Sequence, residues 1–217
     1  IHTLNWDLRT EGATTFPGMI LWGATTAGPV VVPGSYQVKM TVDGKTETRA
    51  LTVRRNPLIT DVTLTDMQEQ FALATQIRDK LSEANDAVVQ IRDLKKQVAD
   101  PLTKSPHAAL KSVADTLAKR LSAVEESIYQ VRNQSGQDPL NFPIKVNNRL
   151  GTLLRTVSTG DGKPIASARP IFNDLSAELK VETDRLQKVL TVDLPKLNAE
   201  LARVGLEAVK PAAKTIS

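Results

Sequence analysis

The spacing of apolar residues changes near residue 63, and this change constrains the fold more than any other feature of the chain. Before it, apolar and polar residues alternate, as in the stretch Tyr36 to Val42. After it, apolar residues recur at every third or fourth position, beginning with the row from Met67 to Val98. Alternation is typical of a strand with one buried face, and the longer spacing of an amphipathic helix. The sequence therefore predicts a segregated α+β fold, with a strand domain at residues 1–57 and a helical domain at residues 58–217.

The strand domain is predicted to be a small antiparallel β-sandwich. Two alternating runs, 36–42 and 45–53, flank Asp43-Gly44, a pair that favours a hairpin because both residues tolerate positive φ. Earlier short apolar runs, at 6–9 and 16–23, suggest further strands separated by Gly and Pro turns. An immunoglobulin-like sandwich has about 100 residues. This one is much shorter, so it is expected to be truncated, with strands missing from its front.

The helical domain is predicted to be an antiparallel bundle of about four helices. The first helix is expected from about 66 to 99, with Thr65 and Gln68 as a capping box and Pro101 as its end. Ser105-Pro106 is expected to begin the second helix. Short connections favour an up-down-up-down arrangement, and a long two-helix hairpin with the other helices packed against it fits equally well.

The second half of the bundle is marked by two further apolar rows. One lies at residues 146–157 and the other begins near Ala168. Pro195 is expected to restart or kink this last helix, because proline lacks the N–H that continues the helical ladder. From Leu206 the sequence is expected to form a frayed tail.

Composition argues against several functional classes. The chain has 28 basic and 24 acidic residues, a net charge of +4, and the two signs are interspersed. Nucleic-acid binding is not expected, because it usually gathers basic residues on one stripe. Cysteine is absent, which removes disulfides and thiolate chemistry. No apolar run approaches the ~20 residues of a membrane span.

The residues that usually carry catalysis or bind metals form no recognisable motif. The two histidines, His2 and His107, lie in different halves of the chain and outside any metal-binding pattern. The serine elbow, the phosphate-binding loop and the calcium loop are also absent. We therefore expect no catalytic residue, no metal site and no cofactor in this chain.

The aromatic residues of the strand domain are the candidate ligand-binding residues. Trp6, Trp22 and Tyr36 lie with Phe16 within a short stretch of an aromatic-poor chain. Rings on a small sandwich can stack on the apolar face of a sugar, which would make Trp6, Trp22 and Tyr36 a carbohydrate site. The alternative is that the rings fill the core or cover an interface with a neighbouring domain.

Several stretches resemble one family. WDLR, FPGMILWG, GPVVVPGSYQVKMTVDGK, RRNP, QIRDKLSEANDAVVQIRDL and SGQDPLNFPIKVNNRLGTL are similar to the C-terminal region of bacterial exported glycosyl hydrolase-like or sortilin-like proteins with neuraminidase-type repeats. The resemblance implies an upstream β-propeller, then a small sandwich, then a helical tail. It also implies an extracytoplasmic location, either periplasmic or secreted. The Asp-box pattern SxDxGxTW does not occur in this chain, so no catalytic residue of that family is carried over.

The resemblance and the residues together predict a non-catalytic accessory region of a larger exported protein. Its expected partner is the upstream β-propeller of the same polypeptide, which it would support or orient. We expect no enzymatic activity from the chain itself, although the parent could be a glycoside hydrolase. Two alternatives remain open: a carbohydrate-binding module that uses Trp6, Trp22 and Tyr36, and an oligomerisation module that uses the long helices.

Overall fold

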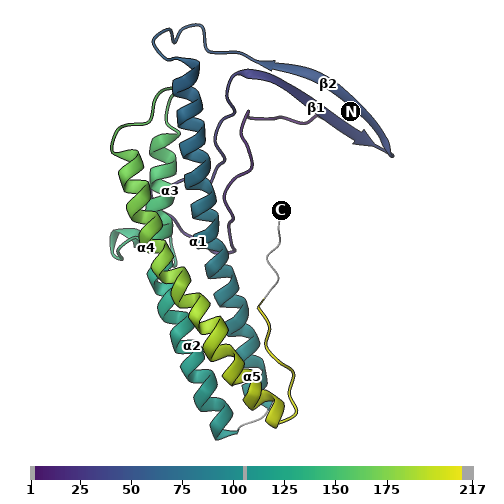
Figure 1. Ribbon diagram of the computed structural model, residues 1–217, viewed down its shortest axis with the longest axis vertical. Coiled ribbons are helices and arrows are strands. Elements are labelled where there is room, and N and C mark those ends of the chain that lie inside the picture. Colours follow the sequence, from purple (N-terminus) through teal and green to yellow (C-terminus); the bar gives the residue numbers. More distant parts are fainter. Residues whose placement is uncertain (1–2, 105–106, 212–217) are drawn as a thin grey trace.

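The computed structural model describes residues 3–104 and 107–211 and has a mixed architecture of one two-stranded sheet and a helical bundle. Figure 1 shows the helices as an elongated bundle, with the sheet standing away from it near one end of α1. The elements, in chain order, are β1 (Gly34–Val42), β2 (Lys45–Val53), α1 (Leu64–Lys104), α2 (Ala108–Ile128), η1 (Asp138–Leu140), α3 (Val146–Val157), α4 (Ala168–Lys188), η2 (Val189–Asp193) and α5 (Leu194–Arg203).

The long helix α1 is the spine of the bundle. Its 41 residues span about 60 Å at about 1.5 Å per residue. It contacts α2, α3 and α4, while α5 packs on α2 (Figure 1). The apolar row predicted from the sequence forms its buried side, with Ile77, Leu81 and Ile91 fully enclosed. The predicted bundle of about four helices is therefore confirmed, with α5 continuing the line of α4.

The ends of α1 differ from the sequence prediction. The capping box is formed by Thr63 and Asp66, two residues earlier than predicted. The Thr63 Oγ1 accepts a hydrogen bond from the Asp66 N–H at 3.1 Å, and the Asp66 carboxylate accepts one from the Thr63 N–H at 2.9 Å. The helix also continues past Pro101 to Lys104. The predicted start of the second helix, Ser105-Pro106, lies outside the described residues.

Pro195 interrupts the last helix as predicted. The five residues of η2 form a π-helical turn, and α5 begins directly after it with Pro195 in its first turn. A wider turn accommodates a residue that cannot donate a backbone hydrogen bond. The Asp193 carboxylate, 7% exposed, accepts a hydrogen bond from the Arg120 guanidinium of α2 at 2.6 Å, which joins the turn to the bundle.

The predicted hairpin is present, but the predicted β-sandwich is not seen in the described residues. β1 and β2 pair antiparallel in the register Val42↔Lys45 to Gly34↔Val53. Asp43 and Gly44 have φ of 50° and 76°, as a tight hairpin turn requires. Within the described part of residues 1–33, the only strand-like pairing is a single bridge, Arg9↔Val30.

The segment 3–33 packs on the helices instead of forming a second sheet. Ala13 and Phe16 are buried and belong to the same hydrophobic cluster as the helices. The Phe16 ring meets the Tyr129 ring edge-on, with centroids 5.1 Å apart. The Arg92 guanidinium lies 4.6 Å from the Phe16 centroid. The sandwich prediction failed because these apolar residues find their partners in the bundle.

Amide side chains fasten extended segments to the helices. In each of three residue pairs, a side-chain amide binds the backbone of its partner residue twice. Its oxygen accepts from the partner's N–H, and its nitrogen donates to the partner's C=O. The pairs are Asn148 with Trp22, Asn198 with Val209, and Gln97 with Lys210. Residues 206–211 of the stretch predicted as a frayed tail are therefore held to the bundle at Val209 and Lys210, and Val209 is 4% exposed. Residues 212–217 of that stretch lie outside the described residues.

Candidate functional site

The hairpin exposes three large apolar side chains in a row on strand β1. Residues paired across the strands point to the same side of a sheet. One side, which we call the hairpin face, therefore carries the apolar residues Tyr36, Val38, Met40, Val42, Leu51 and Val53. Val38, Met40 and Val42 are 49%, 53% and 56% exposed. The other side carries mainly Ser, Thr and Gln.

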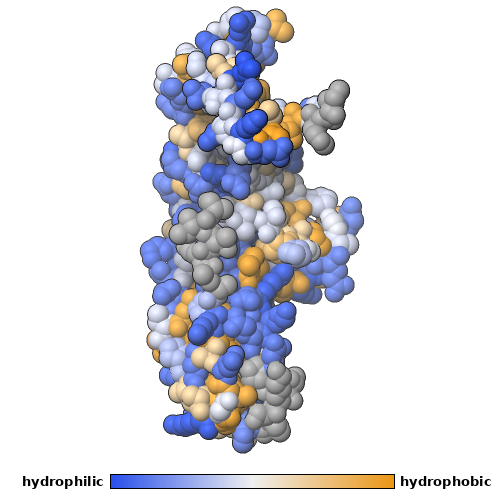
Figure 2. Space-filling view, turned by 90° about the vertical axis from the view of Figure 1, so that its right-hand side faces the viewer, coloured by the Kyte–Doolittle hydropathy of each residue, from blue (hydrophilic) through white to orange (hydrophobic). Residues whose placement is uncertain are grey.

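The hairpin receives little support from the rest of the described chain. Its strands contact each other, and they contact none of the described helices. Only Tyr36, Leu51 and Val53, near its base, are half-buried. Figure 2, which looks onto the side from which the hairpin projects, shows hydrophobic side chains at the surface near that end of the molecule. A two-stranded hairpin alone is marginally stable in water. Such a structure is expected to gain stability from another surface.

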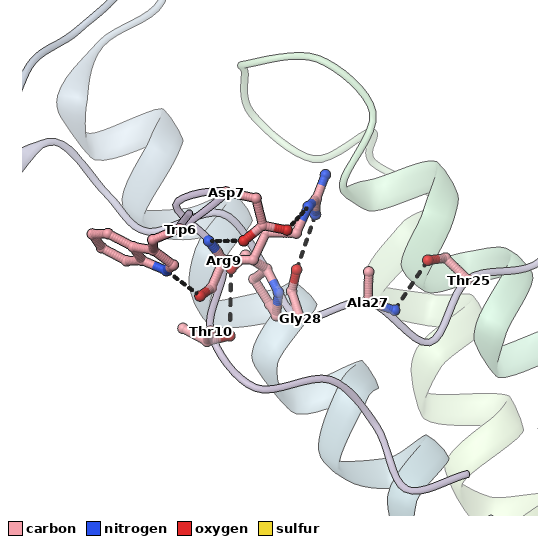
Figure 3. Close-up of polar contacts among 8 residues, drawn as sticks. Trp6, Asp7, Arg9, Thr10, Thr25, Ala27 and Gly28 are labelled. Carbon is pink, nitrogen blue, oxygen red and sulfur yellow. Dashed lines mark hydrogen bonds and ion pairs between the residues drawn. The ribbon is translucent and has the colours of Figure 1, made fainter. Parts of the chain in front are cut away.

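The base of the hairpin face is covered by Trp6. The rings of Trp6 and Tyr36 meet edge-on, with centroids 6.2 Å apart and planes at 68°. The Trp6 indole N–H donates to the Arg9 carbonyl at 2.8 Å, and the Tyr36 hydroxyl donates to the Val32 carbonyl. In Figure 3 the Trp6 ring and the Arg9 guanidinium point to opposite sides of the segment. Two of the three predicted ligand-binding residues are thus brought together, but not as a coplanar platform.

Trp22, the third predicted residue, is held elsewhere, on α3. Its peptide group is bonded to Asn148, and its side chain is 42% exposed. The structure therefore divides the three candidate rings between two places. Phe16, the fourth aromatic residue of the stretch, is a core residue at 7% exposure.

Two hollows lie where the segment 3–33 meets the helices. An open one of about 510 Å³ is lined by Gly23, Thr152, Arg155, Thr156 and Thr159. A smaller one of about 240 Å³ is lined by Arg9, Pro29, Val30, Gln70, Phe71, Ala74, Ser158, Gly160 and Asp161. None of Trp6, Trp22 and Tyr36 lines either hollow. The smaller hollow has a single carboxylate, so it lacks the two carboxylates of a typical glycosidase site.

The buried carboxylate of Glu125 belongs to an ion-pair cluster between helices. Glu125, 4% exposed, accepts hydrogen bonds from Arg92 Nε at 2.7 Å and Lys95 Nζ at 3.1 Å. The two basic partners offset the cost of burying this carboxylate. Because Arg92 also lies against Phe16 and Tyr129, this cluster joins the segment 3–33 to α1 and α2.

Neither metal ligands nor a membrane-crossing helix is found in the part of the chain that the structure describes. No group of three or more acidic or histidine side chains there could hold a metal ion. His107 is exposed at the start of α2, and His2 lies outside the described residues. No described helix is both long and apolar enough to cross a bilayer.

Comparisons with protein-family models, with curated proteins and with solved structures gave no match.

The sequence indicated the hairpin, but it did not predict that the hairpin would make no contact with the described helices. Alternating Tyr36, Val38, Met40 and Val42 suggested a buried row. That row is exposed because the apolar residues of the segment 3–33, which were expected to cover it, pack on the bundle instead. The amide contacts were missed too, because Asn148 is 126 residues from its partner Trp22 and no local pattern marks such a pair.

Proposed function

We propose that this chain is a non-catalytic accessory region, in which a helical bundle supports a β-hairpin that docks onto a β-rich partner domain. The observation that carries this proposal is the hairpin face. Val38, Met40 and Val42 are about half exposed on a hairpin that contacts no described helix. Because each of these side chains is already half buried, completing its burial in a complex contributes roughly 1 kcal/mol.

The partner that we propose is an upstream β-propeller of the same polypeptide, in an extracytoplasmic protein of the glycosyl hydrolase-like class. The resemblance of the stretches WDLR, FPGMILWG and SGQDPLNFPIKVNNRLGTL to the C-terminal region of such proteins supports this choice. A sheet from the partner, packed on the hairpin face, would complete an immunoglobulin-like sandwich together with the hairpin. The region would then orient the propeller and take no part in its chemistry.

The test uses the region encoded upstream of Ile1, produced as a separate protein. Its affinity for this chain is measured for the wild type and for the variant Val38→Asp/Met40→Asp. We expect the variant to bind about tenfold more weakly or worse, because it places charge on the hairpin face. The matched control is Ala50→Asp/Thr52→Asp, which adds the same charge to the opposite side of the sheet, on β2, and should retain affinity. Equal affinity of both variants would exclude docking through this face.

A second candidate function, carbohydrate binding, is favoured by the exposure of Trp6 and Trp22, at 45% and 42%. An exposed indole is a surface on which a sugar ring can stack. Binding to an array of glycans is measured for the wild type and for Trp22→Ala and Trp6→Ala. Loss of a bound glycan in either variant would support that ring as the site. Unchanged binding in both would exclude the two tryptophans.

A further inference from the structure

The outer edge of β1 is a second feature of the hairpin, distinct from its apolar face. The two-residue loop makes Val42 and Lys45 a hydrogen-bonded pair, and such pairs then alternate along an antiparallel ladder. The N–H and C=O groups of Gln37, Lys39 and Thr41 consequently point away from β2. Their counterparts on the other edge belong to Thr46, Thr48 and Ala50. None of these backbone groups has a hydrogen-bond partner among the described residues.

The two open edges differ in how well they are protected. On β2, the residues that share the hairpin face include the charged Lys45, Glu47 and Arg49, all exposed. Charged side chains in such a row protect an edge against pairing with another strand. On β1 the corresponding row is Tyr36, Val38, Met40 and Val42. The only charged residue of β1 is Lys39, on the opposite side.

We propose that the β1 edge receives an added strand from the docking partner. This inference rests on the proposed function and specifies how the partner binds. The added strand pairs antiparallel with β1, carries apolar side chains at alternate positions beside Tyr36, Val38 and Met40, and places an acidic residue beside Lys39. Main-chain hydrogen bonds supply affinity in strand addition, and the alternate side chains supply specificity.

The energetic reason lies in the size of the sheet. Three strands with an apolar face are enough for independent stability, whereas two are marginal. An added strand would pair the open amides of Gln37, Lys39 and Thr41, and it would widen the apolar surface that begins at the hairpin face. The β2 edge offers the same amides beside a charged row, so addition there would place the partner's apolar residues next to Lys45, Glu47 and Arg49.

The test uses the full chain prepared with one methylated backbone nitrogen. Methylation at Lys39 removes an outward-pointing donor of β1, and methylation at Thr48, its cross-strand neighbour, removes one of β2. Both leave the hydrogen bonds between the strands intact. The probe is a synthetic peptide as long as the nine residues of β1. It has valine beside the hairpin face, glutamate beside Lys39 and threonine elsewhere, with its own outer edge methylated to prevent self-association.

We expect the probe to bind the wild-type chain and the chain methylated at Thr48 equally, and the chain methylated at Lys39 about tenfold more weakly or worse. A charge exchange gives a second measurement that keeps the backbone unmodified. Lys39→Glu should weaken binding of the glutamate probe, and a probe with lysine at that position should restore it. Absence of binding to the wild type, equal effects of the two methylations, or no response to the charge exchange would overturn strand addition at β1.

The upstream protein then distinguishes this inference from the proposed function. If Val38→Asp/Met40→Asp abolishes its binding and methylation at Lys39 does not, the partner docks on the hairpin face and the edge inference fails alone. If neither change has an effect, both proposals fail.

Discussion

The Asn148 side chain binds both backbone polar groups of Trp22: its Oδ1 accepts from the Trp22 N–H at 2.7 Å, and its Nδ2 donates to the Trp22 carbonyl at 2.9 Å. The amide is 3% exposed. The backbone N–H of Asn148 donates to Asn147 Oδ1. Asn147 Nδ2 donates to Asn85 Oδ1, and Asn85 Nδ2 donates to the Thr14 carbonyl. This chain of amides fixes the segment 3–33 on α1 and α3, and so defines where the hairpin leaves the bundle.

Replacing Asn148 with alanine should therefore destabilise the protein. The change leaves the N–H and C=O of Trp22 without their partners, at a cost of about 1–3 kcal/mol in the free energy of unfolding. Urea denaturation monitored by tryptophan fluorescence measures the loss. Asn141→Ala is the control, because Asn141 is exposed and its side chain has no hydrogen-bond partner among the described residues. An equal effect of the two changes would contradict the role given to Asn148.

Phe16 should behave as a core residue of the bundle although it lies far from the helices in sequence. Phe16→Ala removes a ring that packs against Tyr129 and Arg92, and a cost of about 3–5 kcal/mol is expected for a buried phenylalanine. Leu4, which is 92% exposed, is the control, and Leu4→Ala should change stability by about 0.5 kcal/mol or less. Thermal unfolding followed by far-ultraviolet circular dichroism reports both. A Phe16→Ala loss as small as that of Leu4→Ala would mean that this segment is not part of the core.

The loop before η1 should depend on pH through Asp138. Its carboxylate accepts hydrogen bonds from the Gln134 N–H at 2.6 Å and the Ser135 N–H at 2.8 Å, and these bonds lower the pKa of Asp138 below its ordinary value. A carboxyl group whose pKa is lower in the folded state stabilises the fold at pH values above its unfolded pKa, about 3.9. That contribution is lost as the pH falls through the folded-state pKa.

The stability difference between the wild type and Asp138→Asn should consequently be largest near neutral pH and should shrink as the pH falls below about 4. Urea midpoints measured from pH 7 to pH 2.5 give the profile. Asp161→Asn, at an exposed carboxylate for which no hydrogen-bond partner is found among the described residues, is measured in parallel as the control substitution. A flat profile for Asp138→Asn would show that its two hydrogen bonds do not favour the charged form.

The exposed hairpin face should affect association more than folding. Val38→Thr/Met40→Thr replaces two exposed apolar residues with polar residues that favour strands, so the unfolding temperature should change by less than about 2 °C. Self-association at high protein concentration should decrease, because exposed apolar strands promote aggregation. Sedimentation velocity over a concentration series measures this. An unfolding temperature lowered as far as by Phe16→Ala would indicate that the hairpin is packed within the chain.

The local elements of the fold could be predicted from the sequence because local chemistry determines them. Asp43-Gly44 permits positive φ at two successive residues, and the hairpin forms there. The apolar rows locate the helices, and Pro195 locates the π turn. The end of α1 was misplaced because one proline in a last turn removes only one hydrogen bond, and the helix continues from Pro101 to Lys104.

Long-range partners could not be predicted in this way. An apolar residue such as Phe16 carries no mark of whether it will pack on a sheet or on a helix, and this ambiguity produced the sandwich prediction. An asparagine such as Asn148 or Asn198 is typical of turns and caps, and nothing nearby in the sequence indicates a peptide group as its partner. The three candidate ligand-binding rings were likewise divided between the hairpin base and α3 by contacts with distant residues.

The hairpin contacts none of the described helices, and amide hydrogen exchange of the isolated protein measures whether it is nevertheless stabilised. The amides of Val38 and Met40, which point toward β2, are compared with those of the fully buried Ile77 and Leu81 in α1. We predict exchange in the hairpin at least about a thousandfold faster, because opening a marginal two-stranded unit needs far less free energy than opening the core. Equal protection of the two sets would show that the hairpin is already stabilised within the chain. It would contradict the proposal that the hairpin is stabilised by docking onto a partner.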